Sequence, residues 1–338
     1  YVTNYIASIG VISAKIPRSA VNILLMHPLV KKIRKPQIFR ITLNVATKAI
    51  YADVWWNNGY NGSDDIGDKY RGVEVAILDT GIDLDHIYLA DRIIASKDFT
   101  DDNNDTDLNG HGTMVAGIVA STHPTYTGVA FGANLINAKC LNKDGEGQED
   151  WIMDAVEWAV TEVDDTAEVI NTSFGTNQLA PDGESELTRF FDMIVDVYEV
   201  AWVTAAGNRD EDTGSLQLNV PGDNYNGITV GATNDMDTVD RSDDTWASFS
   251  CIGPTEDGRV KPDLVAPGAD IVSTYLGNVL GIGDGTSFSA PMVAGAMALI
   301  MPHLVSMHGT SWYLVAKAWY ELQNFAQRPN LLYSFYLF

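Results

Sequence analysis

The chain has little cysteine, no clear membrane-spanning run and none of the common nucleotide-binding patterns. Two cysteines, Cys140 and Cys251, occur in 338 residues, so cysteine usage says little about the compartment. Both lie in expected core segments, which favours buried free thiols over a disulfide. The segment Ser289–Val305 is uncharged for 17 residues but contains two prolines and a histidine, so a buried core helix is favoured over a membrane span. Neither a G-x-G-x-x-G nor a phosphate-loop pattern follows the apolar strand at Val75–Leu78, which argues against nucleotide binding.

Basic residues are also scarce, and they are unevenly distributed. The chain has 21 Lys and Arg against 45 Asp and Glu, a net charge of −24. The first 50 residues hold eight basic residues and no acidic one, which leaves 13 basic and 45 acidic residues after them, a net charge of −32. This change in composition indicates a domain boundary. We expect a small basic segment over residues 1–45 and a large acidic domain over residues 46–338.

A single serine stands between a glycine turn and a long apolar run. Gly283–Thr286 predicts a tight turn, Ser287 follows it, and the apolar residues begin at once. A serine at a helix start can cap the helix. It also lies where free N–H groups and the helix dipole favour negative charge, which suits a nucleophile whose attack creates an oxyanion. Both interpretations, a capping residue and a nucleophile, are open on this stretch alone.

A nucleophilic serine needs a base and an acid that orients the base. Val75–Leu78 is a continuous apolar run, as expected of a strand buried on both faces of a parallel sheet, and Asp79 follows at its carboxyl end, where open α/β sheets bind ligands. His111 begins a predicted helix between two glycines. Taken alone, Asp79 can be interpreted as a turn aspartate after a strand, and His111 as a residue that caps a helix. Together with Ser287 they give the order Asp, His, Ser.

Four blocks in this order resemble the subtilases, the subtilisin-like serine proteases. They are Ala76–Gly81, His111–Gly117, Ala205–Asn208 and Gly285–Pro291, and the similarity runs from about Asp53 to about Ala326. The resemblance implies an α/β fold with a doubly wound, mostly parallel sheet flanked by helices. An α/β-hydrolase is excluded because the serine lacks G-x-S-x-G and the residue order differs.

The resemblance also implies the site residues of a serine endopeptidase. Ser287 would be the nucleophile, His111 the base and Asp79 its orienting acid, while the Asn208 amide and the Ser287 N–H would bind the oxyanion. Asn219–Gly222 resembles the family's pocket loop, where a cis proline is common. The residues expected to bind substrate are Gly145, Gly147, Ser173, Phe174, Gly175, Ala206 and Gly207. An inactive relative that only binds peptides is the alternative.

An acidic stretch before the histidine block is a candidate calcium site. Residues 98–107 combine carboxylates and amides, the hard oxygen ligands that Ca²⁺ prefers, and some heat-stable subtilases bind calcium in an acidic loop here. The expected ligands are Asp98, Asp101, Asp105 and Asp107, and a solvated acidic loop is the alternative. The family's second common calcium loop is shortened at Ser121–Tyr126, so we expect that site to be absent. No cofactor is expected for catalysis.

The basic segment 1–45 resembles the later part of an α+β pro-segment without its opening strand. Its pattern predicts strand, helix and strand over Ile9–Ile16, Pro17–Met26 and Ile33–Leu43, and the alternative is a basic tail. The resemblance implies a self-processed zymogen, secretion, a monomer, protein or peptide substrates, and neither nucleic-acid binding nor membrane insertion. No signal peptide is visible. Met114 and Phe288 replace common family residues, and the apolar residues 331–338 replace the usual family ending.

Overall fold

The chain divides into two compact units, Tyr1–Arg40 and Ile41–Phe338. The computed structural model describes residues 2–6, 11–14, 17, 19–30, 43–63, 72–210 and 212–308. In the first unit, β1 (Val2–Ile6) pairs antiparallel with β2 (Val11–Ala14), and helix α1 (Ala20–Leu25) follows. The strand β1 was not expected. The extended run predicted over residues 33–43 falls outside the described residues except for Leu43, which begins a helix.

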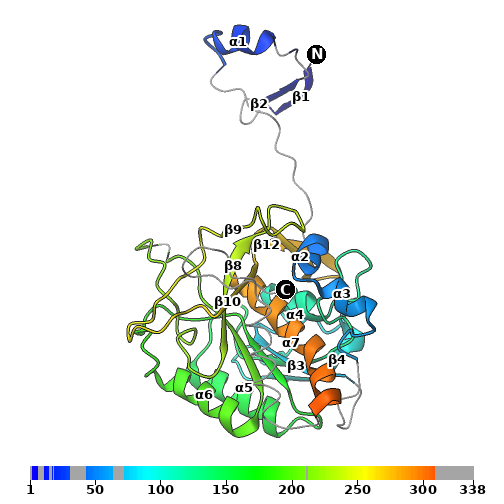
Figure 1. The fold of residues 1–338 in the computed structure, drawn as a ribbon, viewed down its shortest axis with the longest axis vertical. Helices are drawn as coiled ribbons and strands as arrows, with labels where there is room; N and C mark the ends of the chain where they lie inside the picture. Colours follow the sequence, from blue (N-terminus) through cyan, green and yellow to red (C-terminus); the bar gives the residue numbers. More distant parts are fainter. Residues whose placement is uncertain are drawn as a thin grey trace. The chain divides into compact units, whose positions relative to one another are not determined.

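The second unit is built on a mostly parallel sheet, as the resemblance implied (Figure 1). Seven strands lie in the order β10-β8-β7-β6-β3-β5-β4, all parallel, and β9 pairs antiparallel with β8. Their bounds are β3 Glu74–Asp79, β4 Ile93–Asp98, β5 Asn134–Lys139, β6 Val169–Thr172, β7 Ala201–Ala205, β8 Ile228–Asn234, β9 Thr245–Trp246 and β10 Leu264–Pro267. A separate hairpin pairs β11 (Ile271–Tyr275) with β12 (Val279–Gly283).

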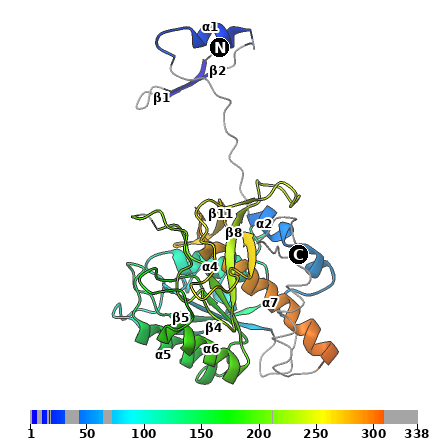
Figure 2. The same ribbon diagram turned by 60° about the vertical axis from the view of Figure 1, so that its left-hand side comes forward.

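Helices cover both faces of this sheet, which explains the continuous apolar runs of its strands. All six residues of β3 are buried. Val75 and Ile77 pack in a cluster with α4 (His111–Ala120) and α7 (Thr286–His308). Ala76 and Leu78 pack on the other face with α5 (Glu149–Thr161) and α6 (Glu186–Tyr198). Figure 2 shows α5 and α6 side by side on one face, with α4 and α7 on the other.

Helix α7 crosses the core, as its uncharged sequence predicted, and begins three residues earlier than expected. Gly295 makes close packing possible, because a Cβ there would lie 2.6 Å from Val129 Cβ. Within the described part of the chain, no helix combines the length and apolar character that a bilayer crossing requires. The apolar residues 331–338 lie outside the described residues.

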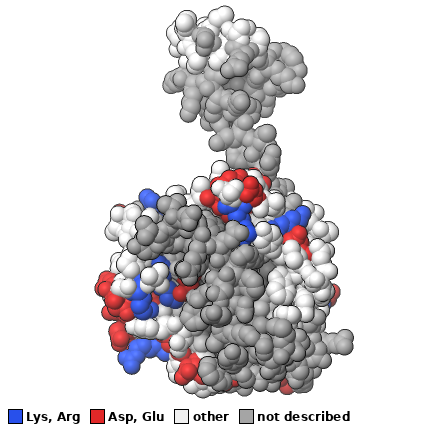
Figure 3. Space-filling view, in the orientation of Figure 1, with Lys and Arg blue, Asp and Glu red and all other residues white. Residues whose placement is uncertain are grey.

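Several elements have no counterpart among the sequence expectations. Strand β4 extends the sheet beyond β5, and the 3₁₀ turn η1 (Ala90–Arg92) precedes it. Helices α2 (Leu43–Ala49) and α3 (Ala52–Asn57) precede the first strand of the sheet. Trp56 of α3 donates from Nε1 to Val129 O at 2.8 Å. Figure 3 shows acidic and basic side chains exposed in separate patches on one face of this unit.

The strand order explains where a site can form. From β3 the chain builds β4 and β5 on one side and β6, β7 and β8 on the other. Crevices in such sheets open at the carboxyl ends of the strands where the order reverses. Asp79 ends β3, Lys139 ends β5 and Ala205 ends β7. Residues far apart in the sequence therefore meet at this edge.

Candidate active site

Asp79 is fully buried and bonded to the His111 ring. The distance from His111 Nδ1 to Asp79 Oδ1 is 2.7 Å, and the same oxygen accepts from Thr80 N at 2.7 Å. Asp79 Oδ2 is buried and has no hydrogen-bond partner in the described part of the chain. Since Nδ1 faces the carboxylate, the imidazole presents Nε2 for a reaction.

His111 is the first residue of α4, and glycine allows the strand end and the helix start to approach. A Cβ on Gly112 would lie 2.1 Å from Gly81 O, so no larger residue fits there. Thr80 Oγ1 accepts from Gly112 N at 3.0 Å, which joins the residue after Asp79 to the residue after His111. The His111 side chain remains 30% exposed, so its outer nitrogen is open to a substrate.

The pKa of His111 is raised above its ordinary value. Burial of the ring lowers this pKa, but the charge of Asp79, its hydrogen bond and the charge of Asp107 together raise it by more. A base whose pKa is raised accepts a proton more readily in a transition state. The neighbouring Cys140 thiol is buried near Asp79, and burial raises its pKa well above the ordinary value, so it stays protonated and unreactive.

Ser287 is the second residue of α7, and it forms a reciprocal pair with Ser173. Its Oγ donates to Ser173 O at 2.8 Å, and Ser173 Oγ donates to Ser287 O at 2.9 Å. A residue in the first turn of a helix has no helical carbonyl for its N–H, so the Ser287 N–H is available beside the hydroxyl. The described contacts direct the hydroxyl to the Ser173 carbonyl and include no hydrogen bond to His111.

Asn208 is held at the start of α7 by its side-chain oxygen. Oδ1 accepts from Thr286 N at 3.0 Å and from Thr286 Oγ1 at 3.2 Å. Thr286 Oγ1 in turn accepts from Gly207 N at 3.1 Å. Because the oxygen is bonded inward, the Nδ2 donor is left for a ligand.

One cleft of about 350 Å³ brings most of the predicted residues together. Its lining includes His111, Asn208 and Ser287, while Asp79 lies beneath the imidazole. Five of the seven predicted substrate-binding residues line it, namely Gly145, Ser173, Phe174, Gly175 and Gly207. Gly147 and Ala206 do not. Ala205 lines the cleft in place of Ala206, since successive residues of a strand point to opposite faces.

Sequence reasoning missed several lining residues that flank the predicted ones. These are Thr80, Asn109, Leu141, Ala205 and Thr286. Each lies within four residues of a predicted site residue, and that proximity was the available signal. The Val220–Pro221 peptide of the expected pocket loop is cis. Cys140 and Cys251 are free and buried, and Met114 and Phe288 are buried.

Comparison with known proteins identifies the family. The Subtilase family model matches residues 70–320. The chain belongs to the subtilases. It is 35% identical over 319 residues to serine protease AprX of Bacillus subtilis (strain 168), a match that covers 86% of this chain and 69% of that protein. It is 39% identical over 238 residues to an intracellular serine protease of Paenibacillus polymyxa, covering 68% and 67%. It is 35% identical over 254 residues to subtilisin NAT of Bacillus subtilis subsp. natto, covering 75% and 59%.

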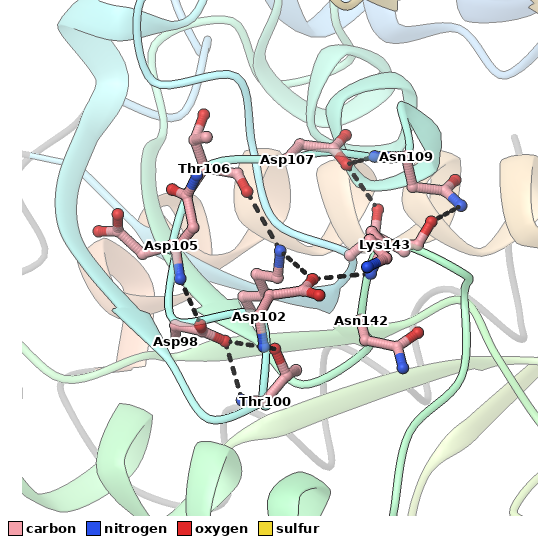
Figure 4. Close-up of polar contacts among 12 residues, drawn as sticks. Asp98, Thr100, Asp102, Asp105, Thr106, Asp107, Asn109, Asn142 and Lys143 are labelled. Carbon is pink, nitrogen blue, oxygen red and sulfur yellow. Dashed lines mark hydrogen bonds and ion pairs between the residues drawn. The ribbon is translucent and has the colours of Figure 1, made fainter.

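Carboxylates of the acidic loop of this subtilase accept hydrogen bonds from donors of the protein itself (Figure 4). Asp98 accepts from Thr100 N, Thr100 Oγ1 and Asn104 N at 2.7–2.8 Å. Asp105 Oδ2 accepts from Ser96 Oγ at 2.7 Å. Asp101 is exposed.

Asp107 is 4% exposed and caps the helix that carries His111. Its two oxygens accept five hydrogen bonds, three from Thr80 Oγ1, Asn109 N and Gly110 N and two from Thr113 N and Oγ1. Among the residues that the structure describes, no three His, Cys, Asp or Glu side chains are grouped to hold a metal ion. As arranged, the four predicted ligands do not fit a calcium site, and calcium stays an untested prediction for this subtilase.

Proposed function

We propose that the protein is a serine endopeptidase that cleaves peptide bonds through Ser287, His111 and Asp79. The observation that carries the proposal is one cleft lined by Ser287, His111 and Asn208, with the Asp79 carboxylate bonded to the imidazole. The family match and relatives named serine proteases support the same activity.

The proposed reaction proceeds through an acyl-enzyme. Ser287 Oγ leaves its hydrogen bond to Ser173, passes its proton to His111 Nε2 and attacks the carbonyl carbon of the substrate. The imidazolium then protonates the leaving amine as the peptide bond breaks. Water repeats the sequence: it gives a proton to the imidazole and attacks the ester carbonyl, and the imidazolium then protonates Ser287 Oγ as the acid product leaves. Asp79 keeps the proton on Nδ1 and stabilises the imidazolium through its hydrogen bond and its negative charge.

The oxyanion of each tetrahedral intermediate would accept two hydrogen bonds. Among the described residues Asn208 Nδ2 has no hydrogen-bond partner, while its Oδ1 is held by Thr286, and the Ser287 N–H lies in the first turn of α7. Donors that are fixed before the reaction stabilise the developing charge without reorganisation. The substrate chain would lie against Gly145 on one side and Ser173–Gly175 on the other, with the apolar Phe174 at the wall of a specificity pocket.

Processing and location are separate parts of the proposal. The basic residues 1–45 would act as a pro-segment for the acidic domain, with self-cleavage between Leu43 and Asp53, and opposite charge would assist docking. A separately made 1–45 peptide should inhibit the processed enzyme more strongly at low salt than at high salt. Secretion of a monomer is our hypothesis from the resemblance, although one relative is named an intracellular protease. Assaying medium and cell lysate of the source organism tests it.

A serine-directed fluorophosphonate probe tests the chemistry. The wild type should be labelled on Ser287 and should hydrolyse peptides, while Ser287→Ala should do neither and should keep the same circular-dichroism spectrum. Peptide binding by a wild type that is neither labelled nor active would contradict the proposal and favour the inactive, peptide-binding relative.

A further inference from the structure

The exposed loop Asn142–Gly147 forms one edge of the cleft through Gly145. Asn142 N donates to Glu146 O at 2.8 Å, and Gly145 N donates to Asn142 O at 2.9 Å. Asn142 Oδ1 accepts from Asp144 N and Glu146 N at 3.0 Å. These contacts shape the turn itself, but they do not fix it to the rest of the domain.

The backbone of Lys143 makes the fixing contacts. Its N–H donates to Asp102 Oδ2 at 2.7 Å, and its carbonyl accepts from Asn109 Nδ2 at 3.0 Å. Figure 4 shows Asp102 and Asn109 meeting this backbone. Asn109 Oδ1 also accepts from His111 N at 3.2 Å. We call these two side chains, Asp102 and Asn109, the Lys143 clamp.

A buried lysine holds one half of the Lys143 clamp. Lys139 Nζ lies 2.9 Å from Asp102 Oδ2, and the two side chains are 0% and 6% exposed. The ammonium also donates to Thr106 O at 3.2 Å. Burial alone raises the pKa of Asp102, but the hydrogen bonds and charge of Lys139 and the Lys143 N–H lower it by more. Asp102 is therefore a carboxylate at neutral pH.

This ion pair connects the exposed loop to the sheet. Lys139 ends β5, whose neighbour β3 carries Asp79. An ammonium buried without its carboxylate is strongly unfavourable, so the position of Asp102 is dictated by Lys139. The Lys143 N–H is bonded to the same carboxylate oxygen, so its position relative to the central strands is also fixed. A loop held in place before binding loses less conformational entropy when a ligand orders it.

We propose that Asp102, held by the buried Lys139 ammonium, is a positioning residue that fixes the Asn142–Gly147 loop for extended peptide substrates. The inference rests on the proposed protease function and concerns recognition by the same cleft. Asp102 touches neither Ser287 nor His111, so it acts on the binding of the substrate chain that lies along Gly145. Loss of the clamp raises KM for a long peptide and leaves the chemistry on a short ester unchanged.

Two double variants of the full chain isolate the clamp. D102A/K139M removes both buried charges and leaves Lys143 N without an acceptor. D102N/K139M also removes both charges, but its amide oxygen can still accept from Lys143 N. Asp154→Ala, a change at an exposed carboxylate of α5, is the single-site control. Each protein is assayed with a tetrapeptide anilide and with an acetylated single-residue ester, and thermal unfolding is recorded in parallel.

We expect D102A/K139M to show a KM for the tetrapeptide about 5- to 10-fold above that of D102N/K139M, the loss of about one hydrogen bond. Ester hydrolysis, kcat and the unfolding midpoint should agree between the two doubles, and Asp154→Ala should match the wild type. Equal tetrapeptide KM values in the two doubles overturn the proposal, as does a parallel loss on peptide and ester. If the wild type hydrolyses neither substrate, the proposed function fails instead. The effect of the clamp is then measured as the Kd of a tetrapeptide with a non-cleavable reduced bond. The Kd for D102A/K139M should exceed that for D102N/K139M by the same factor.

Discussion

Replacing Asp107 by Asn tests whether this carboxylate, rather than a bound calcium ion, organises the catalytic helix. Five donors converge on its two oxygens. An amide offers one oxygen, so its NH₂ group must face either the two donors of Thr113 or the three on the other side. A hydrogen bond to a charged group contributes about 1.5–3 kcal/mol, and leaving a buried donor unsatisfied costs about 1–3 kcal/mol. We expect the free energy of unfolding to fall by about 3–5 kcal/mol.

The same substitution changes the pH dependence of activity in a defined direction. Burial lowers the pKa of His111, and Asp79 and then Asp107 raise it. Removing the Asp107 charge removes one raising influence, so the pKa of the imidazole falls. The base is active when neutral, and therefore the acid limb of the kcat/KM profile should move to lower pH.

Urea denaturation and the pH profile of kcat/KM measure the two effects. The unfolding experiment belongs in the Ser287→Ala background, which prevents self-digestion. Asp101→Asn removes the same charge from an exposed position of the loop and should change neither quantity. An acid limb that stays in place or moves to higher pH would refute the electrostatic argument. A variant as stable as the wild type would refute the capping role.

Three further outcomes are expected. Asn208→Ala should lower kcat by about 100- to 1000-fold with little change in KM, the loss known for the corresponding donor of subtilisin; a loss below tenfold in steady-state kinetics would contradict an oxyanion role. Burial raises the pKa of Asp235 to about 6 and that of Asp244 to about 7, so the folded state binds protons more tightly than the unfolded state and stability falls as pH rises from about 4 to 7. The double variant D235N/D244N should flatten that slope in urea titrations, and an unchanged slope would count against it. Chelation with EGTA should leave the unfolding midpoint unchanged, because Asp98, Asp105 and Asp107 already accept hydrogen bonds from protein donors, and a large drop would support the calcium prediction.

The family and the parallel sheet were predicted from sequence patterns and are confirmed, whereas the reacting residues stay a prediction. Strands buried on both faces appear in the sequence as continuous apolar runs, and Asp79 directly follows the run of one such strand. His111 and Ser287 stand at helix starts marked by glycine. These are local patterns, so each is visible within about ten residues of chain, and their order was enough to predict which ones act together.

The roles of the acidic residues became visible only in the folded chain. The sequence presented residues 98–107 as one group of similar ligands, yet Asp107 caps α4, Asp98 closes its own loop and Asp102 pairs with Lys139. Lys139 and Asp102 are 37 positions apart, on different elements, and nothing periodic relates them. Core positions can be predicted because buried apolar residues repeat with the period of a helix or strand. The role of a carboxylate has no such period, because it depends on which hydrogen-bond donors the fold brings near it.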